Sequence, residues 1–237
     1  MIVALFDIDG TLLNTGGAGQ AAMEAALAEA FGIRVRPHGI PTAGRTDRAI
    51  TEDLFGHFGI PDCPGNRRLF VDTYVRHLQR TLAECRGAVL PGVRDLLETL
   101  SGDGRIVIGL LTGNYSRGAW AKLRHFRLDA YFAFGAFGDE HRHRDDVARE
   151  ARRELARRLD PDRSVRTVWV IGDTPADVTC GRAIGARTMA VATGVFPADV
   201  IRAAGPDVLL DDLSDHARVV RTLLDGHPSH APRDGCC

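Results

Sequence analysis

The chain has 237 residues, of which 44% are hydrophobic and 26% are charged, the composition of an ordinary globular protein. Its formal net charge of -1 offers no basic surface for nucleic acid or anionic membranes, so we expect a small-molecule partner. No apolar run approaches the length of a membrane span, and the five cysteines show neither paired CxxC spacing nor the density of a disulfide framework. These features predict a cytoplasmic protein with reduced thiols.

Short apolar runs, mostly rich in β-branched residues, alternate with helical patterns along most of the chain. The runs predict buried strands at 3–6, 106–111, 168–171, 188–192 and 208–210. The helical patterns cover 93–100, 117–125, 146–159, 177–184 and 215–224. This alternation predicts an α/β fold, a Rossmann-like parallel sheet with helices on both faces.

Residues 14–87 interrupt the alternation, because this stretch carries only helical patterns, at 18–31, 47–58 and 67–84. We predict an all-helical cap domain at 14–87, inserted into a core domain formed by 1–13 and 88–226. Its hinges are expected at Gly16, Gly17 and Gly19 on entry, and at Gly87 and Pro91-Gly92 on exit. The last residues, 227–237, are rich in Pro, Gly, His and Ser and are expected to form a disordered tail.

The first predicted strand ends in two carboxylates, Asp7 and Asp9, followed by Gly10. Side chains two apart on a strand point to the same face, so the two carboxylates can converge. Carboxylates that close repel each other unless a cation neutralises them or one holds a proton. One carboxylate can then act as a nucleophile beside a metal, and the other can carry a proton.

Two other strand exits carry polar groups. Thr112, Gly113 and Asn114 offer a hydroxyl and backbone N–H groups that suit a phosphate. Asp173 and Asp177 add hard oxygen ligands of the kind that hold Mg²⁺. The concentrated negative charge needs a counterion besides the metal. Lys122, the only lysine among 30 basic residues, is expected to supply it from the first turns of the helix after Thr112.

These motifs, in this order, resemble those of haloacid dehalogenase superfamily hydrolases: DxDGT, a strand-ending Ser or Thr, a Lys, and GDxxxD. Within this superfamily, the chain most resembles the subfamilies of phosphoglycolate phosphatase and β-phosphoglucomutase, which have a helical cap. The resemblance implies that Asp7 is the nucleophile that becomes an aspartyl-phosphate. It implies that Asp9 protonates the leaving oxygen and then activates water.

The same resemblance assigns the remaining residues. Thr112, with the neighbouring amides of Gly113 and Asn114, would hold the phosphoryl group, and Lys122 would balance charge. Asp173 would bind Mg²⁺ together with Asp7 and the carbonyl of Asp9. Asp177 would orient the metal waters or Lys122.

The chain departs from the family pattern at one point, because many members carry the lysine in a Lys-Pro pair before the metal strand. Here that segment reads Glu-His-Arg-His-Arg-Asp at 140–145, so Arg144 is the reserve choice for the charge-balancing residue. On the predicted cap, the loop 41–47 resembles the substrate-facing loop of small helical caps. Arg45 on this loop could bind an anionic group of the leaving alcohol.

Each motif also has a purely structural interpretation. Asp7 and Asp9 could form a turn, Thr112 and the pair Asp173 and Asp177 could cap helices, and the basic side chains could be solvated surface. Their joint order favours an enzyme. Asp9 favours phosphoryl transfer over dehalogenation, because dehalogenases of the superfamily typically lack an acid there.

We therefore predict a Mg²⁺-dependent phosphatase acting on a small phosphate monoester, such as phosphoglycolate, a sugar phosphate or a biosynthetic intermediate. A phosphomutase of the β-phosphoglucomutase type is the alternative within enzymes. A non-catalytic protein that binds a phosphorylated ligand is the alternative outside them.

Overall fold

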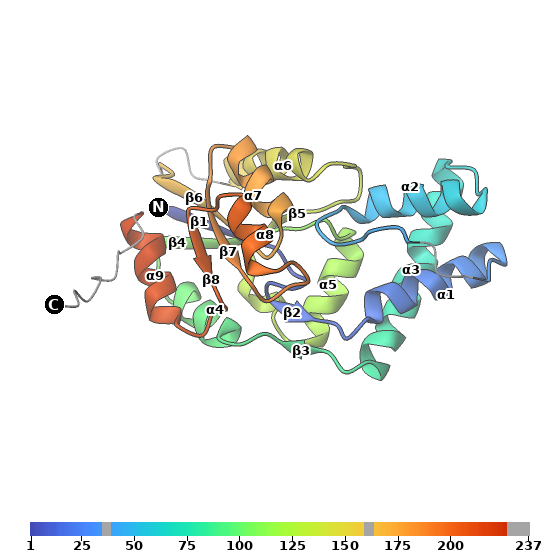
Figure 1. Cartoon of the computed structure of the whole chain (residues 1–237), viewed down its shortest axis with the longest axis horizontal. Helices are drawn as coiled ribbons and strands as arrows, with labels where there is room; N and C mark the ends of the chain where they lie inside the picture. The colour runs from blue at the N-terminus through green and yellow to red at the C-terminus, as the bar shows by residue number, and fades with distance from the viewer. Residues whose placement is uncertain (35–38, 159–163, 227–237) are drawn as a thin grey trace.

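The computed structural model of the chain describes residues 1–34, 39–158 and 164–226. The predicted tail at 227–237 and the last residue of the helix predicted at 146–159 lie outside these residues. In Figure 1, the sheet and its flanking helices form the left part of the molecule, and three further helices, α1, α2 and α3, lie together on the right. Within the described residues, no helix is both long and apolar enough to cross a membrane.

The main sheet has six strands in the order β5-β4-β1-β6-β7-β8, and every neighbouring pair is parallel. Its strands are β1 (Ile2–Phe6), β4 (Ile106–Leu111), β5 (Gly135–Ala136), β6 (Thr167–Gly172), β7 (Arg187–Val191) and β8 (Val208–Leu210). The predicted α/β fold is confirmed, and the five predicted strands are present. The two-residue strand β5 was not predicted, because it is too short to show a pattern.

Helices cover both faces of this sheet. They are α4 (Val93–Ser101), α5 (Ser116–His125), α6 (Arg144–Arg158), α7 (Pro175–Ala183), α8 (Ala198–Ala203) and α9 (His216–Asp225), with a 3₁₀ turn at Asp129–Tyr131. Alternate residues of β1 enter different cores, as expected from the two-residue period of a strand. Phe6 packs in the cluster that contains Leu96 of α4 and Val219 of α9. Leu5 packs in the cluster that contains Val147 of α6 and Cys180 of α7.

The three remaining helices are α1 (Ala18–Phe31), α2 (Asp47–Phe58) and α3 (Pro64–Glu84), as the sequence predicts for this stretch. They bury an apolar cluster of their own, in which Phe55 of α2 packs edge-on against Phe70 of α3, with ring centroids 5.6 Å apart. Tyr115, which precedes α5, joins this cluster from the sheet side. We call α1, α2 and α3 the helical unit.

The chain enters and leaves the helical unit through a small antiparallel ladder that the sequence did not reveal. It consists of β2 (Leu13–Asn14) and β3 (Ala88–Val89), with Leu13 paired to Val89 and Asn14 paired to Ala88. Gly16 follows with a φ of 63°, and a Cβ there would lie 2.7 Å from the carbonyl oxygen of Arg86. The two connections therefore run in close contact where the helical unit meets the sheet.

Candidate active site

The strands β1, β4 and β6 are neighbours in the sheet, so their carboxyl ends lie at one edge and bring the polar clusters together. Asp7 directly follows β1, is buried, and donates its backbone N–H to the carbonyl of Ile171 at 2.9 Å. Gly10 has a φ of 80° and turns the chain away from the sheet. Asp7 and Asp9 line one cavity, as their spacing predicts.

The two carboxylates nevertheless have different partners. Asp9 Oδ2 accepts hydrogen bonds from Lys122 Nζ at 2.6 Å and from Asn114 Nδ2 at 2.9 Å. Asp7 Oδ1 lies 3.3 Å from Arg144 Nη1. The side chain of Asp9 is 41% exposed and that of Asp7 is 10% exposed, so Asp9 is the carboxylate open to solvent.

At the end of β4, Thr112 is fully buried and its hydroxyl accepts a hydrogen bond from Asn114 Nδ2 at 2.8 Å. The other amide atom, Asn114 Oδ1, accepts from Lys122 Nζ at 2.6 Å. Asn114 therefore connects Thr112, Asp9 and Lys122 in one network. Lys122 is 4% exposed and lies in the last turn of α5, so the expectation that it lies in the first turns was wrong.

At the end of β6, Asp173 accepts a hydrogen bond from the hydroxyl of Thr11 at 3.0 Å. Thr11 is buried, and we did not assign it a role from the sequence, although it belongs to the first motif. Asp177 forms a capping box with Thr174 at the start of α7, with Asp177 Oδ2 2.7 Å from Thr174 Oγ1. One carboxylate oxygen of Asp177 thus has the helix-capping role of the structural interpretation.

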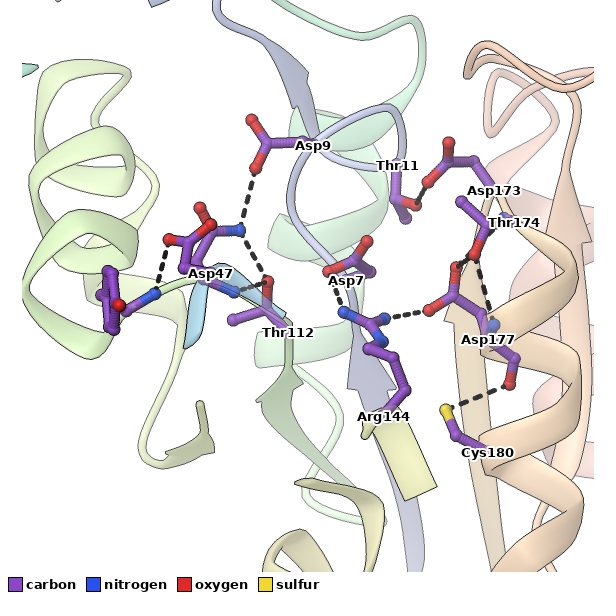
Figure 2. Close-up of polar contacts among 12 residues, drawn as sticks. Asp7, Asp9, Thr11, Asp47, Thr112, Arg144, Asp173, Thr174, Asp177 and Cys180 are labelled. Carbon is purple, nitrogen blue, oxygen red and sulfur yellow. Dashed lines mark hydrogen bonds and ion pairs between the residues drawn. The ribbon is translucent and has the colours of Figure 1, made fainter. Parts of the chain in front are cut away.

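The other oxygen of Asp177 pairs with Arg144. Figure 2 shows the guanidinium of Arg144 between Asp7 and Asp177, and both contacts are ion pairs. Arg144 begins α6 and is only 7% exposed. Its Nε atom is buried and has no hydrogen-bond partner within the described residues. Arg144, the reserve choice for the charge-balancing residue, therefore lies inside the site, as does Lys122.

Carboxylate oxygens of Asp7, Asp173 and Asp177 all lie within 4.8 Å of one another. Burial is the main cause that raises the pKa of Asp7 to about 6 and that of Asp173 to about 8. Neighbouring carboxylates contribute to both rises, and Arg144 opposes the rise at Asp7. A Cβ on Gly10 or Gly194 would collide with the Asp173 carboxylate, so both positions need glycine. This buried set of hard oxygen donors, crowded with like charge, could hold a divalent metal such as Mg²⁺. The side chain of Asp9, which faces Lys122, is outside this set.

The cavity at this edge has a volume of about 460 Å³ and is also lined by the helical unit and the loop before α2. Arg45 lines it, but Arg45 Nη2 lies 2.6 Å from Asp53 Oδ2, and Nη1 donates to the carbonyl of Pro41. This loop reaches the end of β4, where the backbone N–H of Asp47 donates to the carbonyl of Gly113 at 2.7 Å.

Asp47 is a further site residue that the sequence did not single out. It is buried, it lines the cavity, and it accepts a hydrogen bond from the backbone N–H of Tyr115 at 2.8 Å. Burial raises its pKa to about 6, against the opposing effect of Lys122. Its role depends on how α2 meets the end of β4, which no local pattern in the sequence encodes.

Known proteins share this architecture. The chain is 26% identical over 232 residues to a protein of Dickeya dadantii named probable phosphatase IndB, covering 94% of each chain. Among solved structures, CbbY from Rhodobacter sphaeroides in complex with phosphate aligns with a TM-score of 0.69 at 21% identity, over 90% of this chain and 95% of that one. A hydrolase from Pseudomonas syringae aligns with the same TM-score at 19% identity, over 96% and 100% of the two chains.

The model of the family described as haloacid dehalogenase-like hydrolase matches residues 4–191. This match spans most of the chain and includes all three strand exits that line the cavity. The chain belongs to the haloacid dehalogenase-like hydrolase family.

Proposed function

We propose that the chain is a Mg²⁺-dependent phosphatase that hydrolyses a small phosphate monoester through an aspartyl-phosphate on Asp7. The observation that carries this proposal is the separation of the two carboxylates within one cavity: Asp7 pairs with Arg144, and Asp9 pairs with Lys122. A phosphatase of this kind needs one carboxylate that stays ionised and one that exchanges a proton with the alcohol oxygen and water. The name of the Dickeya dadantii relative, probable phosphatase IndB, agrees with it.

In the first step, an oxygen of Asp7 bonds to phosphorus and the bond between phosphorus and the alcohol oxygen breaks. Protonated Asp9 gives its proton to that oxygen, so the alcohol leaves neutral. In the second step, a water oxygen attacks phosphorus, Asp9 takes a proton from this water, and the bond from phosphorus to Asp7 breaks. Inorganic phosphate leaves, Asp7 is ionised again, and Asp9 is protonated for the next turnover.

The other residues bind and position. Thr112 and the backbone of Gly113 and Asn114 would hold the phosphoryl oxygens, and Lys122 would offset the charge beside Asp9. Asp7, Asp173 and the Asp9 carbonyl would hold Mg²⁺, with Asp177 supporting the site. When bound, this ion would neutralise charge on the phosphoryl group.

We also propose that residues 14–87 act as a cap domain on a core formed by 1–13 and 88–226. The helical unit has its own apolar cluster and lines one side of the cavity, which supports this division. Arg45 would contact the alcohol part of the substrate from the loop before α2. Contact between the cap and the core would exclude bulk water from the reaction.

The test is Mg²⁺-dependent release of phosphate from an aryl phosphate. Asp7→Asn should abolish release, whereas the matched change Asp199→Asn, at an exposed carboxylate on α8, should leave it intact. Asp9→Asn should slow the hydrolysis of phosphate esters of poorly acidic alcohols about 100-fold or more. Hydrolysis of aryl phosphates should slow much less, because an aryl leaving group needs little protonation. Full turnover by Asp7→Asn would refute the covalent step. Isomerisation of a sugar phosphate without release of phosphate would indicate a phosphomutase instead.

A further inference from the structure

We propose that the helical unit carries a subsite for the alcohol part of the substrate, selective for an uncharged or cationic alcohol that bears hydroxyl or amine groups. Anionic alcohols, such as glycolate, would be disfavoured. This inference rests on the proposed phosphatase function, because it places the phosphate at the strand exits. The alcohol then extends into the half of the cavity lined by α1, α2 and α3.

One wall of this half is apolar. Met23 and Leu27 of α1 and Ile50 and Leu54 of α2 line the cavity, and all four are buried in the core of the helical unit. Such a wall favours the carbon skeleton of a ligand and offers nothing to replace the water around a charged group. The cavity volume of about 460 Å³ falls in the range of small-molecule sites, so it admits alcohols larger than two or three carbons.

Tyr74 of α3 provides a polar group in this half. Its side chain is 1% exposed and lines the cavity, and its ring packs so closely on α5 that a Cβ on Gly118 would lie 3.3 Å from the hydroxyl oxygen. Among the described residues, no hydrogen bond to this hydroxyl is formed. The hydroxyl oxygen is not one of the fully buried polar atoms that lack a partner within the described residues, so it is open to the cavity, where a ligand can hydrogen-bond it in place of water.

Glu24 of α1 provides the charge that sets the selectivity. It lines the cavity, and its Oε1 atom accepts a hydrogen bond from Gln20 Nε2 at 2.9 Å. No basic side chain of the described residues forms an ion pair with Glu24, which leaves its charge uncompensated and its second oxygen available. A hydroxyl or ammonium group of the ligand can donate to that oxygen, whereas a carboxylate would be repelled by it.

Arg45 and Lys122 are the basic residues of the described lining that could reverse this preference, and both charges are already paired, that of Lys122 with Asp9. The guanidinium of Arg45 donates to Asp53 at 2.6 Å and to the Pro41 carbonyl at 3.1 Å. It can still contact a ligand, but the ion pair with Asp53 weakens its attraction for a second anionic group. The described lining of the helical half therefore has no net positive charge to offer.

The experiment compares three sugar phosphates of similar size: glucose phosphate, glucosamine phosphate and phosphogluconate, whose alcohol parts are neutral, cationic and anionic. Their dissociation constants are measured by calorimetry on the Asp7→Asn protein with Mg²⁺, where turnover is blocked. Phosphate release from each is measured with the wild-type chain. We expect the neutral and cationic ligands to bind at least about tenfold more tightly than the anionic one.

Three further changes are made in the Asp7→Asn background. Glu24→Gln should narrow the preference for the cationic over the anionic ligand by about tenfold, and Glu98→Gln, at an exposed glutamate on α4, should not change it. Asp53→Asn should improve binding of the anionic ligand by releasing Arg45. Tyr74→Phe should weaken binding of the neutral ligand about three- to tenfold.

Binding of the anionic ligand as tight as that of the others, no binding of any of the three, or an unchanged preference in Glu24→Gln would each overturn the subsite. If the ligands bind in the expected order but the wild type releases no phosphate, the proposed phosphatase function fails and the subsite remains. If phosphate is released fastest from phosphogluconate, the phosphatase function remains and the subsite fails.

Discussion

The guanidinium of Arg144 forms an ion pair with Asp7, with 3.3 Å between Nη1 and Oδ1, and it pairs with Asp177 on its other side. Lys122 pairs instead with Asp9. The sequence presented these two cations as alternatives for one role, but the structure gives each its own carboxylate. We therefore expect changes at Arg144 and at Lys122 to have different effects.

Arg144→Ala should destabilise the fold strongly, because it leaves Asp7 and Asp177 buried without their counterion. Removal of one partner of a buried ion pair typically costs about 3–5 kcal/mol of unfolding free energy. Arg149→Ala is the matched control on the same helix, since Arg149 is half-exposed and forms a surface ion pair with Asp146. Its cost should be about 0–1 kcal/mol. Urea unfolding without Mg²⁺ measures the unfolding free energy of both variants. Equal losses in the two would contradict the role of Arg144 as the counterion of Asp7 and Asp177.

Lys122→Met should mainly reduce turnover. The change removes the cation that donates to Asp9 and Asn114, and loss of one such preorganised donor typically lowers kcat about 10²- to 10³-fold. Arg124→Met, at an exposed residue on the same helix, serves as the control. Steady-state kinetics with an aryl phosphate compares the two variants. A Lys122→Met protein that keeps kcat within about twofold of the wild type would rule out this role.

Mg²⁺ should stabilise the chain against heat if the cluster of Asp7, Asp173 and Asp177 binds it. A ligand at about 100 times its Kd adds about 2.7 kcal/mol, which corresponds to roughly 5–10 °C in Tm for a chain of this size. Asp173→Asn should remove most of this shift, and Asp199→Asn should keep it. Thermal unfolding with and without Mg²⁺ is the measurement. The same shift in all three proteins would place the ion elsewhere.

Asp47→Asn should stabilise the fold at neutral pH. Burial raises the folded-state pKa of Asp47 from 3.8 to about 6, with Lys122 lowering it and Asp9 and Asp139 raising it. The folded state thus binds this proton more tightly than the unfolded chain does, so the wild type loses stability as pH rises from about 4 to about 6. Asparagine does not titrate and can still accept the hydrogen bond from Tyr115.

The gain from Asp47→Asn should therefore be small near pH 4 and reach roughly 2–3 kcal/mol above pH 6. Urea unfolding of both proteins at several pH values tests this. Asp199→Asn, which changes an exposed carboxylate, should show no such pH-dependent gain. A gain for Asp47→Asn that is the same at every pH would show that its carboxylate is not the cause.

Residues with local signals could be found from the sequence, and residues defined by tertiary contacts could not. Asp7, Thr112 and Asp173 follow apolar runs that read as strands, so their meeting at one edge of a parallel sheet was predictable. Tyr74 belongs to a helix whose sequence pattern looks like any other, and Asp47 ends a loop in which only Arg45 was singled out. They become part of the cavity only because the helical unit packs against the ends of β1 and β4.

Short elements escaped prediction for a related reason. Strands β2, β3 and β5 have two residues each, too few to display a two-residue period, and they are stabilised by partners far away in the sequence. Arg144 was found only as a reserve choice, because Lys122 supplied the expected lysine and no local pattern places the segment 140–145 beside Asp7 and Asp177.

The pairing of Asn14 with Ala88 has a consequence for the assembly of the chain. These residues are opposite each other in an antiparallel ladder, so the whole segment between them takes the place of a hairpin turn. Replacing that segment with two turn residues would join β2 and β3 as an ordinary hairpin, and the chain would still contain all six strands of the main sheet in the same order. The helical unit therefore occupies the position of the loop of this hairpin. Burial of its own apolar core offsets the entropic cost of closing so long a loop.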